Sequence, residues 1–203
     1  KGRIFRPFFC GYSLKKESDK LSPHLLELIK IAKMGDYERA IKYSKKIFQQ
    51  YENSPLFLNT MGIIYRRIKD YEQARLVTEK VLGLDNTLVQ ARLNIASIDI
   101  EEGFVDKAIY TLKNVLKENK NYSEAMTNLA YAFKKKGDFN GSIRYYRKAL
   151  KFPKKLPRSY FNLGTSLLSV KKFKEGWEKY EYRWKVDPGD KVVWPLKDKP
   201  LWD

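Results

Sequence analysis

Residues 128–150 read NLAYAFKKKGDFNGSIRYYRKAL, and three features of this stretch recur every 34 residues along the chain. The small Ser142 belongs to a column that also holds Ala40, Ala74, Ala108 and Gly176. A second column holds Leu28, Gly62, Ala96, Ala130 and Gly164, and a third, bulky and apolar, holds Tyr37, Tyr71, Val105, Phe139 and Phe173. A period of this length is typical of helix-turn-helix solenoids, in which each unit buries its apolar face only against its neighbours.

The period predicts an all-α chain that folds as a right-handed superhelical solenoid of about five repeats. With the small-residue column at position 20, the units run over residues 21–54, 55–88, 89–122, 123–156 and 157–190. Residues 1–20 are then an N-terminal extension, and residues 191–203 a C-terminal connector. Since the chain begins with Lys1 rather than Met, we expect it to be a fragment of a larger protein.

Each unit is expected to hold two antiparallel helices. In the second unit the first helix is predicted over about residues 56–68, and Asp70 is predicted to cap a second helix over about residues 71–82. The corner between the two helices favours a left-handed backbone, which glycine adopts without strain. Glycine stands at this corner in three units, whereas Lys69 and Lys171 replace it in the other two; the glycines are Gly35, Gly103 and Gly137.

The fourth unit resembles the tetratricopeptide repeat at Asn128-Leu129-Ala130, Phe133, Gly137-Asp138-Phe139, Tyr146 and Ala149-Leu150. The fifth unit does so at Asn162-Leu163-Gly164, Phe173, Gly176, Tyr180 and Asp187-Pro188. The resemblance implies a protein–protein interaction module that binds an extended peptide or partner segment in its concave groove. We also expect that this chain has no catalytic activity of its own, because the sequence offers no catalytic constellation of residues.

Asparagine recurs at position 6 of three successive units, as Asn94, Asn128 and Asn162. In the tetratricopeptide fold this position faces the groove, and a side-chain amide offers both a donor and an acceptor to a peptide backbone. Neighbouring helices lie about 10 Å apart and an extended chain advances about 3.3 Å per residue, so one asparagine could hold roughly every third peptide residue. The alternative is that these asparagines only link adjacent helices or solvate the groove.

Basic residues surround this row of asparagines and outnumber two acidic ones, Glu101 and Glu124. The groove is therefore expected to favour acidic peptide segments or a terminal carboxylate. Arg158, Asn162 and Asn128 resemble part of the carboxylate clamp found in a subset of the family, whereas Gln90 stands where its first lysine would fall. The candidate peptide-binding residues are Asn94, Asn128, Asn162, Arg66, Arg67, Lys134, Lys135, Arg158 and Tyr131.

The chain carries 41 basic and 24 acidic residues, a net charge of +17 that attracts polyanions. A basic scaffold that contacts nucleic acid is therefore an alternative function. The lysines are dispersed over nearly every predicted helix rather than interleaved with aromatic residues on one stripe, however. This pattern predicts nonspecific, salt-sensitive adhesion to nucleic acid rather than specific recognition.

The composition argues against several classes of site. Cys10 is the single cysteine and His24 the single histidine, so neither an intrachain disulfide nor a Cys/His zinc cluster is expected. The sequence contains no glycine-rich phosphate-binding loop, and we expect no cofactor, no metal and no catalytic residues. No segment approaches the roughly 20 apolar residues of a membrane helix, and the lack of disulfides weakly favours a cytoplasmic location.

The C-terminal part resembles the last repeat and exit segment of bacterial proteins in which tetratricopeptide repeats precede a glycosyltransferase-like domain. The matching residues are Phe173, Glu175-Gly176-Trp177, Tyr180-Glu181, Arg183-Trp184, Pro200 and Trp202-Asp203. The resemblance implies, as a further alternative, that the repeats recruit the polypeptide acceptor of a parent glycosyltransferase. The spacing of Trp177, Tyr180 and Trp184 also predicts one helical face that caps the open end of the solenoid.

Overall fold

The structure is a computed structural model that describes residues 22–152 and 157–186. The predicted N-terminal extension and C-terminal connector lie outside these residues, as do Pro200 and Trp202-Asp203 of the glycosyltransferase-like resemblance. Every regular element that the structure describes is helical. They are α1 (Pro23–Lys33), α2 (Tyr37–Tyr51), α3 (Pro55–Arg67), α4 (Tyr71–Leu84), α5 (Val89–Glu101), α6 (Val105–Glu118), α7 (Ser123–Lys135), α8 (Phe139–Ala149), α9 (Pro157–Ser169), α10 (Phe173–Tyr180) and the 3₁₀ helix η1 (Glu181–Lys185).

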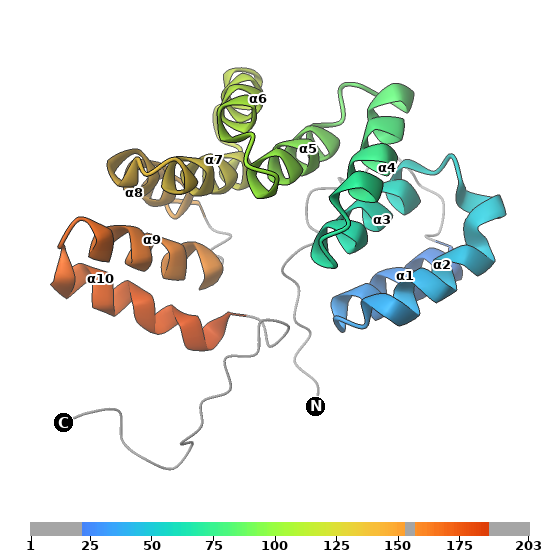
Figure 1. Cartoon of the computed structure of the whole chain (residues 1–203), viewed down its shortest axis with the longest axis horizontal. Helices are drawn as coiled ribbons and strands as arrows, with labels where there is room; N and C mark the ends of the chain where they lie inside the picture. Colours follow the sequence, from blue (N-terminus) through green and yellow to red (C-terminus); the bar gives the residue numbers. More distant parts are fainter. Residues whose placement is uncertain (1–21, 153–156, 187–203) are drawn as a thin grey trace, which may run out of the picture.

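The helices follow one another as packed pairs and form an open arch (Figure 1). The predicted all-α solenoid fold is confirmed. In the second unit, α3 and α4 match the predicted helices to within one residue at three of the four ends, and α4 is two residues longer at its C-terminal end.

Aspartate side chains determine where several of the second helices begin. Oδ1 of Asp70 accepts a hydrogen bond from the backbone N–H of Gln73 at 3.1 Å, which confirms the predicted cap. Asp36 and Asp138 cap α2 and α8 in the same way. An N-terminal side chain of this kind satisfies one of the backbone donors that the first helical turn leaves unpaired.

The corners between paired helices adopt the left-handed conformation that the sequence predicts. Gly35, Gly103 and Gly137 have φ angles of 80°, 92° and 86°. Lys69 and Lys171 take the same conformation, with φ angles of 65° and 60°. Both lysines therefore occupy a backbone region that costs a residue with a Cβ atom about 1–2 kcal/mol.

The columns of small residues mark the places where helices approach closely. Ala40, Ala74, Ala108 and Ser142 are fully buried. A Cβ atom added at Gly164 on α9 would lie 2.5 Å from the backbone nitrogen of Tyr180 on α10. Because backbone atoms cannot move aside without disturbing the helix, only glycine permits this contact between α9 and α10.

The apolar core runs along the arch in three adjoining clusters rather than as a single centre. Phe57, Leu112 and Tyr146 are among the largest fully buried side chains, and they come from different clusters. Such a core is expected of stacked repeats, since each unit contacts its sequence neighbours only.

The end of the last pair differs from its predicted form. Helix α10 ends at Tyr180 and the chain continues as η1, so Trp177, Tyr180 and Trp184 do not share one α-helical face. Trp184 donates from Nε1 to Glu181 at 3.2 Å, and the Arg183 guanidinium lies 4.4 Å from the Trp184 ring centroid. These local contacts accompany the tighter 3₁₀ turn, which is common at helix C-termini.

Candidate functional site

The odd-numbered helices form the inner side of the arch. Each contacts the next odd-numbered helix along the chain, whereas no two even-numbered helices are in contact within the described residues. An arch bends toward the side on which its elements approach one another. Figure 1 accordingly shows α3 and α5 inside the bend, with α4 and α6 outside it.

All nine candidate residues belong to four inner helices, α3, α5, α7 and α9. We call the surface that they form the inner face. Its members are Arg66 and Arg67 on α3, Asn94 on α5, Asn128, Tyr131, Lys134 and Lys135 on α7, and Arg158 and Asn162 on α9.

Two of the three asparagines form hydrogen bonds with the preceding inner helix. Asn94 is 6 % exposed, and its Nδ2 donates to Oδ1 of Asn59 on α3 at 2.5 Å. Nδ2 of the half-buried Asn128 donates to Oγ of Ser97 on α5 at 3.4 Å. The sequence analysis gave two roles for these asparagines, contact with a peptide or links between adjacent helices. The two bonds are links of the second kind. Each amide keeps an acceptor oxygen, and peptide contact stays a prediction.

The third asparagine, Asn162, lies close to a buried phenol. Burial raises the pKa of the Tyr146 hydroxyl, and the side chain of Asn162 opposes this rise. The hydroxyl is nevertheless buried without a well-aligned hydrogen-bond partner, so the geometry between the two groups is poor. Asn162 thus has side-chain hydrogen-bonding capacity that the described contacts do not fully use.

Polar contacts connect α5, α7 and α9 across the inner face. Nζ of Lys134 donates to Oγ1 of Thr165 at 2.6 Å, and burial followed by the charge of Lys135 lowers the Lys134 pKa. The Tyr131 hydroxyl donates to Oε1 of Glu101 at 3.4 Å, and Nζ of Lys135 lies 5.5 Å from the Tyr131 ring centroid. Side chains of successive units therefore interact directly here.

Arg66 lies near the C-terminal end of α3 and is half-buried. Burial lowers its pKa to about 10, and the positive charges of Arg67 and Arg158 lower it as well, while Glu101 opposes them. The guanidinium stays protonated at neutral pH. Arg158 belongs to α9, three units away from α3, and its charge nevertheless acts on Arg66. Helices α3 and α9 are not themselves in contact, so Arg158 acts on Arg66 at a distance.

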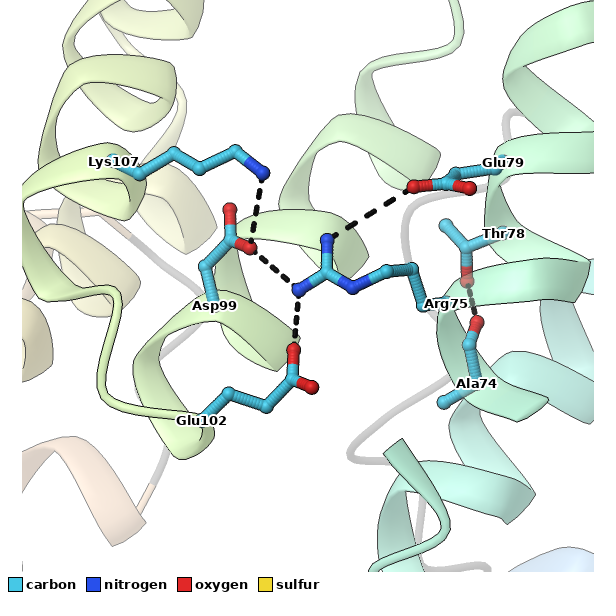
Figure 2. Close-up of polar contacts among 7 residues, drawn as sticks. All are labelled: Ala74, Arg75, Thr78, Glu79, Asp99, Glu102 and Lys107. Atoms are coloured by element: carbon cyan, nitrogen blue, oxygen red, sulfur yellow. Dashed lines mark hydrogen bonds and ion pairs between the residues drawn. The ribbon is translucent and has the colours of Figure 1, made fainter. Parts of the chain in front are cut away.

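A second charged group lies between α4, α5 and α6, and the sequence analysis did not predict it (Figure 2). Nη2 of Arg75 donates to Oδ1 of Asp99 at 2.7 Å and also to Glu102. Nζ of Lys107 lies 3.5 Å from the same Asp99 oxygen. The available signal was one acidic residue, Asp99, between Ile98 and Ile100, since a charge in such a position needs a partner.

The described residues offer few other sites. An apolar hollow of about 240 Å³ lies between α2, α3 and α4 and is lined by residues that include Phe48, Phe57 and Met61, none of them candidates. In residues 22–152 and 157–186, no group of three His, Cys, Asp or Glu side chains is placed to hold a metal ion. None of the described helices combines the length and apolarity needed to cross a lipid bilayer.

Residues 123–155, which contain α7 and α8, match the tetratricopeptide repeat family. The chain therefore contains a tetratricopeptide repeat. No curated protein matches this chain at a significant level. Its fold, however, is shared by many solved structures.

Three solved structures illustrate the likeness. A tetratricopeptide repeat protein from Parabacteroides merdae has a TM-score of 0.75 at 14 % identity, over 85 % of this chain and 68 % of that one. A thermophilic repeat protein of Thermus thermophilus gives 0.71 at 13 % identity, over 82 % and 91 %. MamA from Desulfovibrio magneticus gives 0.57 at 19 % identity, over 82 % and 97 %. At these identities the comparison establishes the fold alone.

The tetratricopeptide-repeat fold indicates a protein–protein interaction module. Its stacked units build an extended concave surface, which is the part of a solenoid that typically binds partners.

Proposed function

We propose that the inner face binds an extended peptide or an extended segment of a partner protein. The observation that supports this most directly is that α3, α5, α7 and α9 contact one another in succession and carry all nine candidate residues. Candidate side chains from the second to the fifth unit thus lie on one series of adjoining helices. A ligand there could contact all four inner helices at once.

An extended peptide suits the dimensions of this face. Four inner helices about 10 Å apart span roughly 30 Å, which an extended chain of about nine residues would cover. The face also carries the groups that a peptide backbone needs, since the amides of Asn128 and Asn162 lie on adjacent inner helices and are half-buried rather than enclosed. Such amides can hold N–H and C=O groups of the ligand and fix its register.

The inner face offers contacts for side chains as well. Tyr131 is half-buried and presents an aromatic ring beside the exposed Lys135. Aromatic side chains supply contact area at a low cost in conformational entropy. The surrounding cations favour ligands with acidic segments, because complementary charge accelerates association and excludes ligands of the same sign.

The test is a selection of displayed random peptides of about twelve residues on the full chain, followed by affinity measurement in solution by fluorescence polarisation. The inner-face variant combines Asn128→Ala, Asn162→Ala and Lys135→Ala. Asn94 is left intact, because its buried bond to Asn59 contributes to folding. We expect affinity for the selected peptides to fall by about tenfold or more, since several peptide contacts are lost together.

The matched control combines Asn114→Ala, Asn140→Ala and Lys117→Ala, which removes the same side-chain types from the outer helices α6 and α8. Its affinity is expected to stay within about twofold of the parent chain, as for residues outside an interface. Selection of no peptide, or equal losses in the two variants at unchanged melting temperature, would rule out the inner face as the binding surface.

A further inference from the structure

The apolar hollow of about 240 Å³ is bounded by α2, α3 and α4, where the outer helices α2 and α4 do not contact each other. Phe48 from α2, Phe57 and Met61 from α3, and Val77 from α4 are among its lining residues. A cavity of about 150 Å³ with apolar walls is large enough to bind benzene. The hollow therefore has room for one aromatic side chain.

The described residues leave the lining of the hollow incompletely covered. Phe48 is 46 % exposed, whereas Phe57 and Met61 are buried. Apolar area that stays in contact with water costs roughly 25 cal/mol for each Å². A further apolar side chain placed in the hollow would cover part of the Phe48 ring, contact the other walls and so stabilise the chain.

An apolar segment of the sequence precedes the first repeat unit. Residues 4–9 read IFRPFF, and four of these six residues carry bulky apolar side chains, three of them phenylalanine. The segment lies outside the described residues. Its composition differs from that of a solvated extension, which is poor in aromatic residues. The other apolar segment outside the repeat units, within residues 191–203, follows the fifth unit and so belongs to the opposite end of the array.

The first described residue lies close to the hollow. The hydroxyl of Ser22 forms a hydrogen bond with the hydroxyl of Tyr51 at the end of α2. The ring centroid of Tyr51 lies 6.3 Å from that of Phe57, which in turn lies 6.1 Å from that of Phe48. Two side-chain contacts thus connect Ser22 to a wall of the hollow. The twelve residues 10–21 can span up to about 40 Å, so residues 4–9 can reach it.

We infer that residues 4–9 dock into this hollow within their own chain, with a phenylalanine ring packed against Phe48 and Met61. A short tether gives the segment an effective concentration in the millimolar range, which favours it over the same segment of a second copy. Aromatic rings pack well against the sulfur of a methionine. The inference does not depend on the proposed function, because none of the nine candidate residues lines the hollow.

The experiment uses the single cysteine and the three methionines of the full chain. A nitroxide spin label is attached to Cys10, next to the segment, and the methionine methyl groups are observed by NMR. Met61 lines the hollow, whereas Met126 belongs to α7, which contacts none of α2, α3 and α4. We expect the label to remove most of the Met61 signal and to leave the Met126 signal unchanged.

Variants of the segment separate docking from mere proximity of the tethered label. The combined change of Phe5→Ser, Phe8→Ser and Phe9→Ser keeps the label and the tether, and it alters no residue of the described solenoid. It should restore most of the Met61 signal. The control combines Tyr12→Ser and Leu14→Ser outside residues 4–9 and should leave the signal lost. Equal loss in the phenylalanine variant and the parent chain would overturn the inference.

A change in the hollow tests the other side of the contact. Val77→Phe places a larger side chain in the hollow and should displace the segment, so that the Met61 signal returns. The control is Leu76→Phe, because Leu76 is 62 % exposed and does not line the hollow. It should leave the signal lost. An unchanged Met61 loss in Val77→Phe, at an unchanged melting temperature, would contradict docking in this hollow.

A mixed sample distinguishes docking within one chain from exchange between two copies. Chains that carry the spin label but no observable methyl groups are mixed with chains that carry observable methyl groups but no spin label. We expect full Met61 intensity in this mixture. A loss as large as in the doubly labelled chain would show that the segment of a second copy occupies the hollow, and the assignment to the same chain would be wrong.

Discussion

Arg75 and Asp99 join the second and third units through a bond of 2.7 Å between Nη2 and Oδ1, at a carboxylate that is 0 % exposed (Figure 2). The second oxygen of Asp99 is buried without a partner. Asp99 therefore depends on Arg75 and on the more distant Lys107 for the compensation of its charge. Removal of one partner from a buried ion pair leaves an isolated charge, which is far more costly than the loss of an exposed pair.

Arg75→Ala is accordingly expected to lower the free energy of unfolding by about 3 kcal/mol. The control is Arg92→Ala. Arg92 has the same side-chain exposure as Arg75, 22 %, but its partner Glu118 is 52 % exposed. That change should cost less than about 1 kcal/mol. Urea unfolding of both variants makes the comparison, and two equally small losses would show that the buried carboxylate does not need Arg75.

Alanine is expected to have opposite effects on stability at Gly164, in the contact between α9 and α10, and at Gly83, which lies in open space on α4. Gly164→Ala should cost about 2 kcal/mol or more, because its Cβ would lie within 3 Å of the backbone of Lys179 and Tyr180. Gly83→Ala on α4 meets nothing within 4 Å and should be neutral or stabilise the protein by up to about 1 kcal/mol. Thermal unfolding of the two variants distinguishes them, and a stable Gly164→Ala chain would contradict the close approach.

The two lysines with left-handed backbone provide a third prediction. Lys69→Gly and Lys171→Gly should each stabilise the fold by up to about 1 kcal/mol, since glycine removes the strain of a positive φ. Gly137→Ala, at the same corner of the fourth unit, should destabilise it by a similar amount. Melting temperatures of the three variants test this, and a loss of stability in both lysine variants would indicate that their side chains contribute more than their backbone costs.

The buried pair of Asn59 and Asn94 gives a fourth prediction. Asn94→Ala should cost about 1–3 kcal/mol, because it leaves the amide of Asn59 buried and unpaired. Asn128→Ala should cost less, since its bond to Ser97 is long and half-buried. A double change of Asn59 and Asn94 to alanine should recover part of the loss, as expected when both partners of a bond are removed. Additive losses in the double variant would argue against the bond.

The parts of the fold that the sequence predicted are those set by local rules that repeat. The period places small residues at helix contacts, an aspartate such as Asp70 starts a helix, and a glycine such as Gly137 turns the corner. Each of these depends on a few neighbouring residues and recurs in several units. The end of α10 was predicted less well, because the pattern of Trp177, Tyr180 and Trp184 cannot show where an α-helix changes to a 3₁₀ turn.

The contacts within the candidate site were harder to predict than the residues that belong to it. Position in the repeat placed the candidates on inner helices, whereas the bonds that Asn94 and Asn128 make to the preceding inner helix were not specified by it. The bond of Asn94 to Asn59 was missed because Asn59 is one position away from the asparagine column. Pairing of this kind depends on how neighbouring units rotate relative to one another, and a repeat frame does not specify that rotation.

The most direct test of the account is a map of backbone amide shifts in the full chain on titration with a library-selected peptide. The account predicts that the perturbed amides lie on α3, α5, α7 and α9, with the Arg66 side-chain signal among those that move. Perturbations concentrated on the outer helices α4, α6 and α8 would contradict it.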